Sequence, residues 1–139
     1  MLGTAILGTL DWNTFSIPQW LRAAGGLLAL SGTSFALWGV SELGAKATQG
    51  LGGELITTGP YRYSRNPQYV GDIALLLGFG LLCNSMLTLG AVALGIGCFF
   101  LAPFAEEPWL GEHLGSSYRE YTRHVPRFLG HFSDTAGAA

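Results

Sequence analysis

The stretch that decides the fold is Gly59-Pro60-Tyr61-Arg62-Tyr63-Ser64-Arg65-Asn66-Pro67-Gln68-Tyr69, here called the hinge. Gly59-Pro60 is typical of a turn. Asn66-Pro67 predicts a second break followed by a helix, because Asn is a favoured N-cap and Pro suits the first helical position. Tyrosines and arginines fill the space between the two breaks in a chain that is otherwise largely apolar. We therefore expect a functional site at a membrane surface.

The composition favours one membrane domain over residues 1–139. Charged residues make up 12% of the chain and the hydrophobic set 49%, whereas a soluble domain carries about 25% charged residues. No CxxC or Cys/His cluster indicates a metal site. The formal net charge of −2 decides little, because the distribution of charge matters more than its sum. The expected partners are the lipid bilayer and the methyl acceptor, with no nucleic acid. The expected fold class is an all-α integral-membrane helical bundle.

Long uncharged stretches predict where the chain crosses the bilayer. Residues 16–43 form the first expected span, since no charge occurs from Ala23 to Ser41 and a bilayer core takes roughly 20 apolar residues. The uncharged run from Ile73 to Ala105 is too long for one ordinary span. Asn84-Ser85 interrupts it, so residues 67–104 are predicted to form a helical hairpin with arms near 67–83 and 86–104. The bundle thus has about three transmembrane helices.

The remaining segments flank this hairpin. Glu106-Glu107 opens an expected pair of amphipathic cytoplasmic helices over residues 105–128, with a break at Gly115. Residues 44–66 are interpreted as a cytoplasmic loop that includes the start of the hinge. Residues 1–15 are an N-terminal stub of uncertain role, and residues 129–139 are a tail.

Positive charge sets the expected orientation. Arginines or lysines precede the hairpin at Lys46, Arg62 and Arg65 and follow it at Arg119, Arg123 and Arg127, while the hairpin tip has none. The positive-inside rule then places the hinge and the C-terminal helices in the cytoplasm. The hinge and Glu106-Glu107 would therefore meet at the two feet of one hairpin, where polar groups distant in sequence can share a site.

The two feet offer complementary chemistry. Arginines and a helix N-terminus at the first foot attract carboxylate or phosphate. The carboxylates of Glu106 and Glu107 attract ammonium or hydroxyl groups, and tyrosine faces hold a flat ring or a cation. A ligand with a carboxylate, an ammonium, a ribose and an adenine, such as S-adenosylmethionine, would fit both feet.

Two motifs carry a resemblance to a known family. The hinge resembles the G-x-Y-x-x-x-R-[HN]-P-x-Y segment of integral-membrane methyltransferases, a group that includes the isoprenylcysteine carboxyl methyltransferase and the phospholipid methyltransferases. Glu106-Glu107, followed by Leu110, Leu114-Gly115, Tyr118, Tyr121 and Val125-Pro126-Arg127, is similar to their C-terminal E-E-x-x-L…[FL]-G-x-x-Y-x-x-Y…V-P-R signature. The match covers about residues 50–128.

The resemblance implies a cytoplasmic pocket for S-adenosylmethionine. The expected cofactor-binding residues are Glu54, Leu55, Ile56, Tyr61, Arg65, Asn66, Pro67, Gln68, Tyr69, Glu106 and Glu107. Two positions depart from the pattern, because Asn66 stands where many members have His and Ala102 stands about where the isoprenylcysteine enzyme has an arginine. The second departure argues against a prenylcysteine acceptor.

The implied reaction is direct methyl transfer to a lipophilic or small amphipathic acceptor that enters from the bilayer. No catalytic base is assigned, and the acceptor atom (oxygen, nitrogen or sulfur) stays open. A second copy of the chain, in a homo-oligomer, could complete the acceptor site. Orientation would supply most of the rate enhancement, since effective molarities reach about 10⁵–10⁸ M.

Two other functions compete with this one. Sterol reductases have a similar S-R-H-P-x-Y-like segment but use NADPH, and both Glu106-Glu107 and the short chain argue against them. A non-catalytic membrane protein that retains the fold is the third hypothesis, because of Asn66 and Ala102. Binding of S-adenosylmethionine, of NADPH or of neither separates the three.

Overall fold

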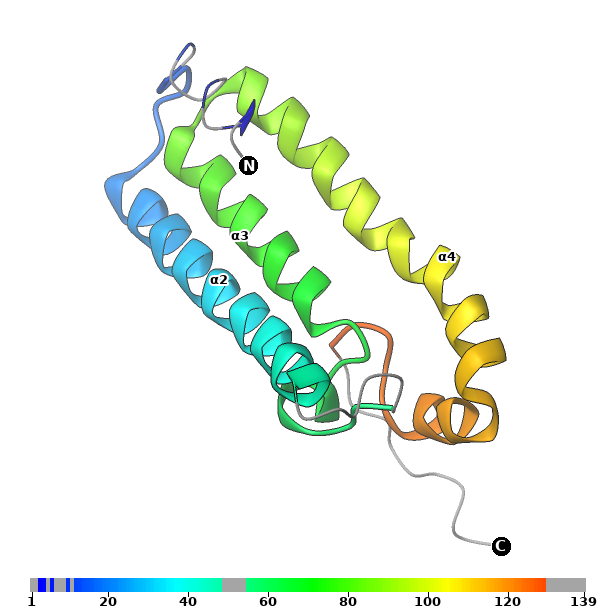
Figure 1. Cartoon of the computed structure of the whole chain (residues 1–139). Helices are drawn as coiled ribbons and strands as arrows, with labels where there is room; N and C mark the ends of the chain where they lie inside the picture. Colours follow the sequence, from blue (N-terminus) through cyan, green and yellow to red (C-terminus); the bar gives the residue numbers. More distant parts are fainter. Residues whose placement is uncertain (1–2, 5, 7–9, 11, 49–54, 130–139) are drawn as a thin grey trace, which may run out of the picture.

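The computed structural model describes residues 3, 4, 6, 10, 12–48 and 55–129. Its three long helices are α2 (Gln19–Thr48), α3 (Pro67–Cys83) and α4 (Met86–His124), and the short 3-10 helix η1 covers Gly59–Arg62. The described residues contain no strand, so this part of the chain is all-α, as expected. Figure 1 shows α3 between α2 and α4, with all three running side by side.

Two of these helices are long and apolar enough to cross a bilayer. One is α2, over Gln19–Gly44, and the other is α4. Helix α3 has 17 residues, so it is about 26 Å long. This is slightly less than the roughly 30 Å thickness of the hydrocarbon core. Large apolar side chains cover the outside of both long helices: Leu27 is 69% exposed, Leu30 68% and Leu94 75%. Such a surface suits lipid and indicates an integral membrane bundle.

The contact between α2 and α3 is made by backbone against backbone. A β-carbon added to Gly32 would lie 2.6 Å from the carbonyl oxygen of Gly71, and one added to Gly71 would lie 2.6 Å from the amide nitrogen of Ala36. Real side chains do not tolerate such distances. Small residues at these positions therefore let the two helices approach closely, which is how helices commonly pack in membranes.

The contact between α3 and α4 is made by side chains. Leu76 of α3 packs over Gly95 of α4, and the Tyr69 ring lies 5.8 Å from the Phe99 ring, measured between centroids. A β-carbon on Gly90 or Gly97 would meet nothing within 4 Å. The face of α4 that carries these two glycines thus has no packing partner among the described residues.

The predicted hairpin turn is present at Asn84-Ser85. Asn84 ends α3 in the left-handed conformation with φ 48°, and the hydroxyl of Ser85 accepts a hydrogen bond of 3.2 Å from the Thr88 amide at the start of α4. Arg22 of α2 donates to the Leu82 carbonyl at 3.2 Å, where a cation also complements the C-terminal helix dipole. The bounds of α3 agree with the predicted arm over residues 67–83.

The C-terminal half of the chain differs from the prediction. No helix boundary occurs near residue 105, because α4 continues through Pro103 and Pro108 to His124. The change from apolar to charged residues at this point leaves the helix intact. α4 departs from helical geometry at Gly115 (φ 61°, ψ −129°), the site of the expected break. Figure 1 shows the segment beyond it turning back under the bundle.

Candidate functional site

The hinge is anchored to α2 and to the end of α4. Thr58, just before η1, donates a hydrogen bond to Glu42 of α2. Tyr61 is buried, and the Tyr121 hydroxyl donates to its carbonyl oxygen at 2.6 Å. Burial first and the negative charge of Glu42 second raise the pKa of Tyr61 to about 12. The phenol therefore stays neutral at physiological pH.

Residues 125–129, here called the C-terminal strap, run along the hinge. The Arg65 amide donates to the Pro126 carbonyl at 2.9 Å, and the side-chain amide of Asn66 donates to the Arg127 carbonyl at 3.0 Å. Ser64 is fully buried and its hydroxyl donates to the same carbonyl at 3.3 Å. These hydrogen bonds hold the end of the hinge against the strap that follows α4.

Asn66 has a different role from the predicted one. It occupies the N-cap position of α3, but its side chain makes no capping hydrogen bond. The amide is committed to Arg127 instead, while the Asn66 backbone N–H donates to the Ser64 hydroxyl at 3.0 Å. The N-cap interpretation of the side chain is wrong. The side-chain amide bonds to Arg127, which is 61 positions away in sequence, and makes no hydrogen bond to the first turn of α3.

Glu106 and Glu107 are neighbours in sequence with different partners. The Tyr69 hydroxyl donates to Oε1 of Glu106 at 2.6 Å, and this carboxylate is exposed. Glu107 is 12% exposed and accepts two hydrogen bonds from Arg127, from Nη2 at 2.6 Å and from Nε at 2.9 Å. Arg65 Nη1 lies 3.3 Å from the same carboxylate. Successive residues on a helix point about 100° apart, which separates the two groups.

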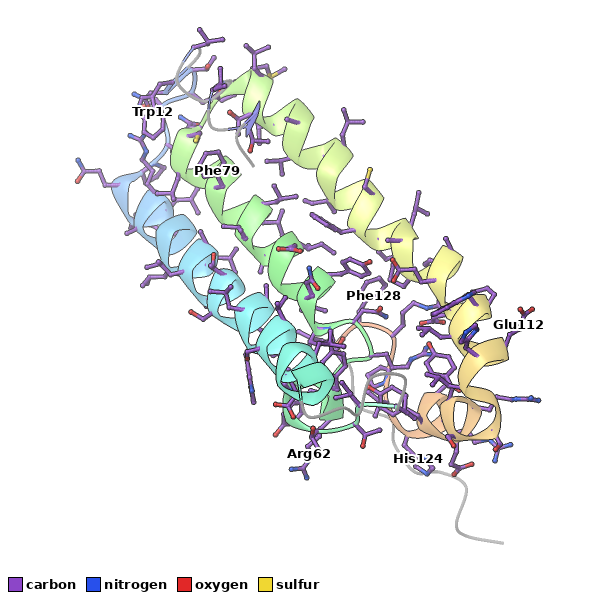
Figure 2. The ribbon with its side chains drawn as sticks, viewed as in Figure 1. Trp12, Arg62, Phe79, Glu112, His124 and Phe128 are labelled. Atoms are coloured by element: carbon purple, nitrogen blue, oxygen red, sulfur yellow. The ribbon has the colours of Figure 1, made fainter. Side chains whose placement is uncertain are left out.

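The Glu107 ion pairs hold the foot of α4 to both the hinge and the strap. Hydrogen bonding to Glu107 raises the pKa of Arg127, and the Arg127 guanidinium also lies 3.9 Å from the centroid of the Phe104 ring. Phe128 stacks on Phe100 at 5.1 Å; Figure 2 shows Phe128 between α3 and α4. This network closes the bundle at the end that carries Arg62 and His124, opposite Trp12.

A cavity of about 290 Å³ lies between the hinge and the foot of α4. Its walls come from the end of α2, the hinge, the start of α3 and α4. The lining residues are Leu43, Leu55, Ile56, Tyr61, Arg65, Asn66, Pro67, Gln68, Tyr69, Glu106, Leu110, Leu114, Tyr118 and Tyr121. We call it the hinge cavity.

The structure brings together most of the candidate residues proposed from the sequence. Nine of the eleven line the hinge cavity. Glu107 does not, because its carboxylate is turned to Arg65 and Arg127. Glu54 lies outside the described residues. The hinge and Glu106 therefore meet at one end of the bundle, as the hairpin predicts.

Sequence reasoning missed the apolar and aromatic floor of the cavity. Leu110, Leu114 and Tyr118 line it, and none of them is among the expected cofactor-binding residues. Their spacing of four indicates one helix face, yet it cannot say whether that face meets protein or an open space. Tyr118, Tyr121 and Val125 form a buried cluster against which Leu55 packs.

The residues that line the hinge cavity include the charged and aromatic groups that a bound S-adenosylmethionine would need. Glu106 supplies an exposed carboxylate for an ammonium or a ribose hydroxyl, and Arg65 supplies a cation for a carboxylate. The tyrosine and leucine side chains supply flat apolar surface for a nucleobase. At about 290 Å³ the cavity is close to the lower end of the roughly 300–1,000 Å³ typical of small-molecule sites. Among the described residues, no group of three or more His, Cys, Asp or Glu side chains could hold a metal ion.

Comparison with known proteins agrees with the geometry of the site. Residues 20–117 match the phospholipid methyltransferase family. The chain belongs to this family. The match includes most of the residues that line the cavity, but it ends before Tyr118 and Tyr121, which line it as well. Family membership and the long apolar helices together indicate an integral membrane protein.

Two curated relatives cover most of the chain. The chain is 29% identical over 129 residues to the nickel-cobalt-cadmium resistance protein NccN of Alcaligenes xylosoxydans xylosoxydans. The aligned region covers 92% of this chain and 58% of NccN. The chain is 24% identical over 133 residues to the cobalt-zinc-cadmium resistance protein CzcN of Cupriavidus metallidurans, covering 96% and 60%. The chain thus spans about three fifths of the length of both relatives. No solved structure matches it.

Proposed function

We propose that the chain is a membrane methyltransferase that uses S-adenosylmethionine and methylates a lipophilic or small amphipathic acceptor. The observation that carries the proposal is the hydrogen bond of 2.6 Å from Tyr69 to Glu106 at the wall of the hinge cavity, in a member of the phospholipid methyltransferase family. It joins the two family motifs around one space. Residues 1–139 would act as one domain.

Each side of the cavity has a distinct task in this proposal. Glu106, held in place by the Tyr69 hydroxyl, binds the positively charged or hydroxyl-bearing part of the cofactor. Arg65 binds its carboxylate, and its own ion pair with Glu107 (3.3 Å) keeps the guanidinium in position. The Tyr61, Leu110 and Leu114 side chains line the cavity beside them and exclude water from the adenosine part.

When bound, S-adenosylmethionine supplies a methyl group on a positively charged sulfur. The protein contributes orientation and a water-poor environment, which together can supply most of the rate enhancement. An acceptor from the bilayer would reach the cavity from the α3 and α4 side. By the positive-inside rule the cavity faces the cytoplasm, and a second copy of the chain could complete the acceptor site.

Isothermal titration tests the cofactor and a labelling experiment tests the reaction. Purified full-length chain should bind S-adenosylmethionine and its demethylated product, and should not bind NADPH. Incubation with methyl-labelled cofactor and a total membrane lipid extract should transfer label to a lipid fraction. Binding of NADPH alone would make the chain a reductase, and binding of none of the three would favour the non-catalytic membrane protein.

Metal resistance is a second candidate role, favoured by the names of the two relatives. If methylation underlies it, a metal-sensitive host that expresses the chain should grow in nickel, cobalt or cadmium with the wild type and not with Glu106→Gln. Equal metal resistance in hosts that express the wild type and Glu106→Gln would show that resistance does not depend on the methyltransferase site.

A further inference from the structure

A second cavity, of about 500 Å³ and more open, adjoins the hinge cavity. Its polar lining comes from three separate segments: Arg65 of the hinge, Glu107, Arg119 and Thr122 of α4, and Arg127 of the strap. Arg65 and Tyr118 line both cavities. We call this second space the arginine cavity.

We propose that the arginine cavity binds the phosphate group of an anionic membrane lipid. This site adjoins the methyl-donor site and shares Arg65 and Tyr118 with it, but its occupation does not require the proposed reaction.

Charge is the first argument. Three guanidinium groups line the space and only one carboxylate opposes them. Both oxygens of Glu107 are already used by Arg65 and Arg127, and Arg119 has no ion pair within the part of the chain that the structure describes. The excess positive charge favours an anion, and guanidinium groups bind phosphate with two parallel hydrogen bonds.

The position of the cavity is the second argument, and it favours a lipid over a soluble phosphate. Phe104 belongs to the lining, is 47% exposed and lies one residue before the end of the uncharged run of α4. The Arg127 guanidinium lies on its ring at 3.9 Å, so charge and apolar surface meet at one rim. A phospholipid could place its phosphate among the arginines while its acyl chains follow the exposed apolar face of α4.

Lipid titration with native mass spectrometry tests the proposal without any methyl donor. Full-length protein in detergent is titrated with phosphatidylglycerol, and the fraction carrying one lipid is measured. Wild-type protein should show one saturable adduct. Arg119→Gln should weaken it about tenfold, as expected for the loss of a charge-assisted contact of about 1.4 kcal/mol.

Arg123→Gln is the matched control. Arg123 is on the same helix, is 75% exposed and pairs with Glu120 at 3.2 Å, but it does not line the cavity. The substitution removes the same charge at a solvent-exposed position outside the cavity, where a charge contributes little, and it should therefore leave the lipid affinity within about twofold. Equal weakening by both variants, or no saturable adduct with the wild type, would mean that the arginines only attract headgroups generally, and would overturn the proposal.

Inorganic phosphate separates the two sources of the same chemistry. At millimolar concentration it should not displace phosphatidylglycerol, because it has no acyl chains to place on Phe104 and α4. Displacement by phosphate at concentrations similar to those of the lipid would identify a site for a soluble phosphate and overturn the lipid assignment. Neither result bears on the proposed function. If the protein binds S-adenosylmethionine by isothermal titration, that function stands whether or not phosphate displaces the lipid.

Discussion

The two helix contacts of α3 differ in kind. Against α2 it packs backbone to backbone at Gly32 and Gly71, whereas against α4 it packs through side chains such as Leu76 and Tyr69. The foot of α4 is then held by the polar contacts of Glu106, Glu107 and the strap. The first contact builds a closely packed pair of helices that carries the hinge, and the second helps to build the cavity.

The largest expected effect follows from the tight contact. Gly32→Leu should destabilise the fold by more than about 3 kcal/mol, because its β-carbon alone would lie 2.6 Å from the Gly71 carbonyl oxygen and from the Leu75 amide nitrogen. The thermal midpoint of the detergent-purified protein measures this. Gly97→Leu is the control, since nothing lies within 4 Å of an added β-carbon there. Similar losses in both variants would contradict the packing argument.

The polar contact at the foot of α4 should give the next largest effect. Glu107→Gln leaves Arg65 and Arg127 without their shared anion, and should cost about 2–3 kcal/mol. Glu112→Gln, on the exposed surface of the same helix, should cost almost nothing. A thermal midpoint equal to that of the wild type in Glu107→Gln would show that α4 is held by apolar packing alone.

Asn66 gives a smaller but sharper test. Asp is as good an N-cap as Asn, but it cannot donate a hydrogen bond to the Arg127 carbonyl. Asn66→Asp should therefore destabilise the protein by about 1 kcal/mol, as much as Asn66→Ala does. If Asn66→Asp kept wild-type stability and only Asn66→Ala lost it, the side chain would act as a helix cap after all.

Local signals explain what the sequence predicted well. Asn66-Pro67 and Asn84-Ser85 break the helical pattern on their own, and they mark the bounds of α3 and the start of α4. Position along a hairpin then suffices to bring Glu106 next to the hinge. Nine of the candidate residues line one cavity for this reason.

Contacts between distant residues explain what the sequence could not predict. Glu106 and Glu107 look equivalent in the motif. Helix geometry points them in different directions, but only the tertiary positions of Tyr69, Arg65 and Arg127 decide which of the two faces the cavity. The unbroken course of α4 past Ala105 was missed because a change from apolar to charged residues does not by itself say whether the backbone stays helical. The contact of Asn66 with the strap likewise depends on tertiary structure.

The most direct test of the central claim is isothermal titration of S-adenosylmethionine into Glu106→Gln and Glu107→Gln, with thermal midpoints measured beside them. Glu106 lines the cavity and Glu107 does not. Glu106→Gln should therefore weaken binding by at least about tenfold, or about 1.4 kcal/mol, with little change in the thermal midpoint. Glu107→Gln should mainly lower the thermal midpoint, and it should weaken binding less than Glu106→Gln does because Glu107 acts on the cofactor only through Arg65. Wild-type affinity in Glu106→Gln would contradict a cofactor site built around this carboxylate.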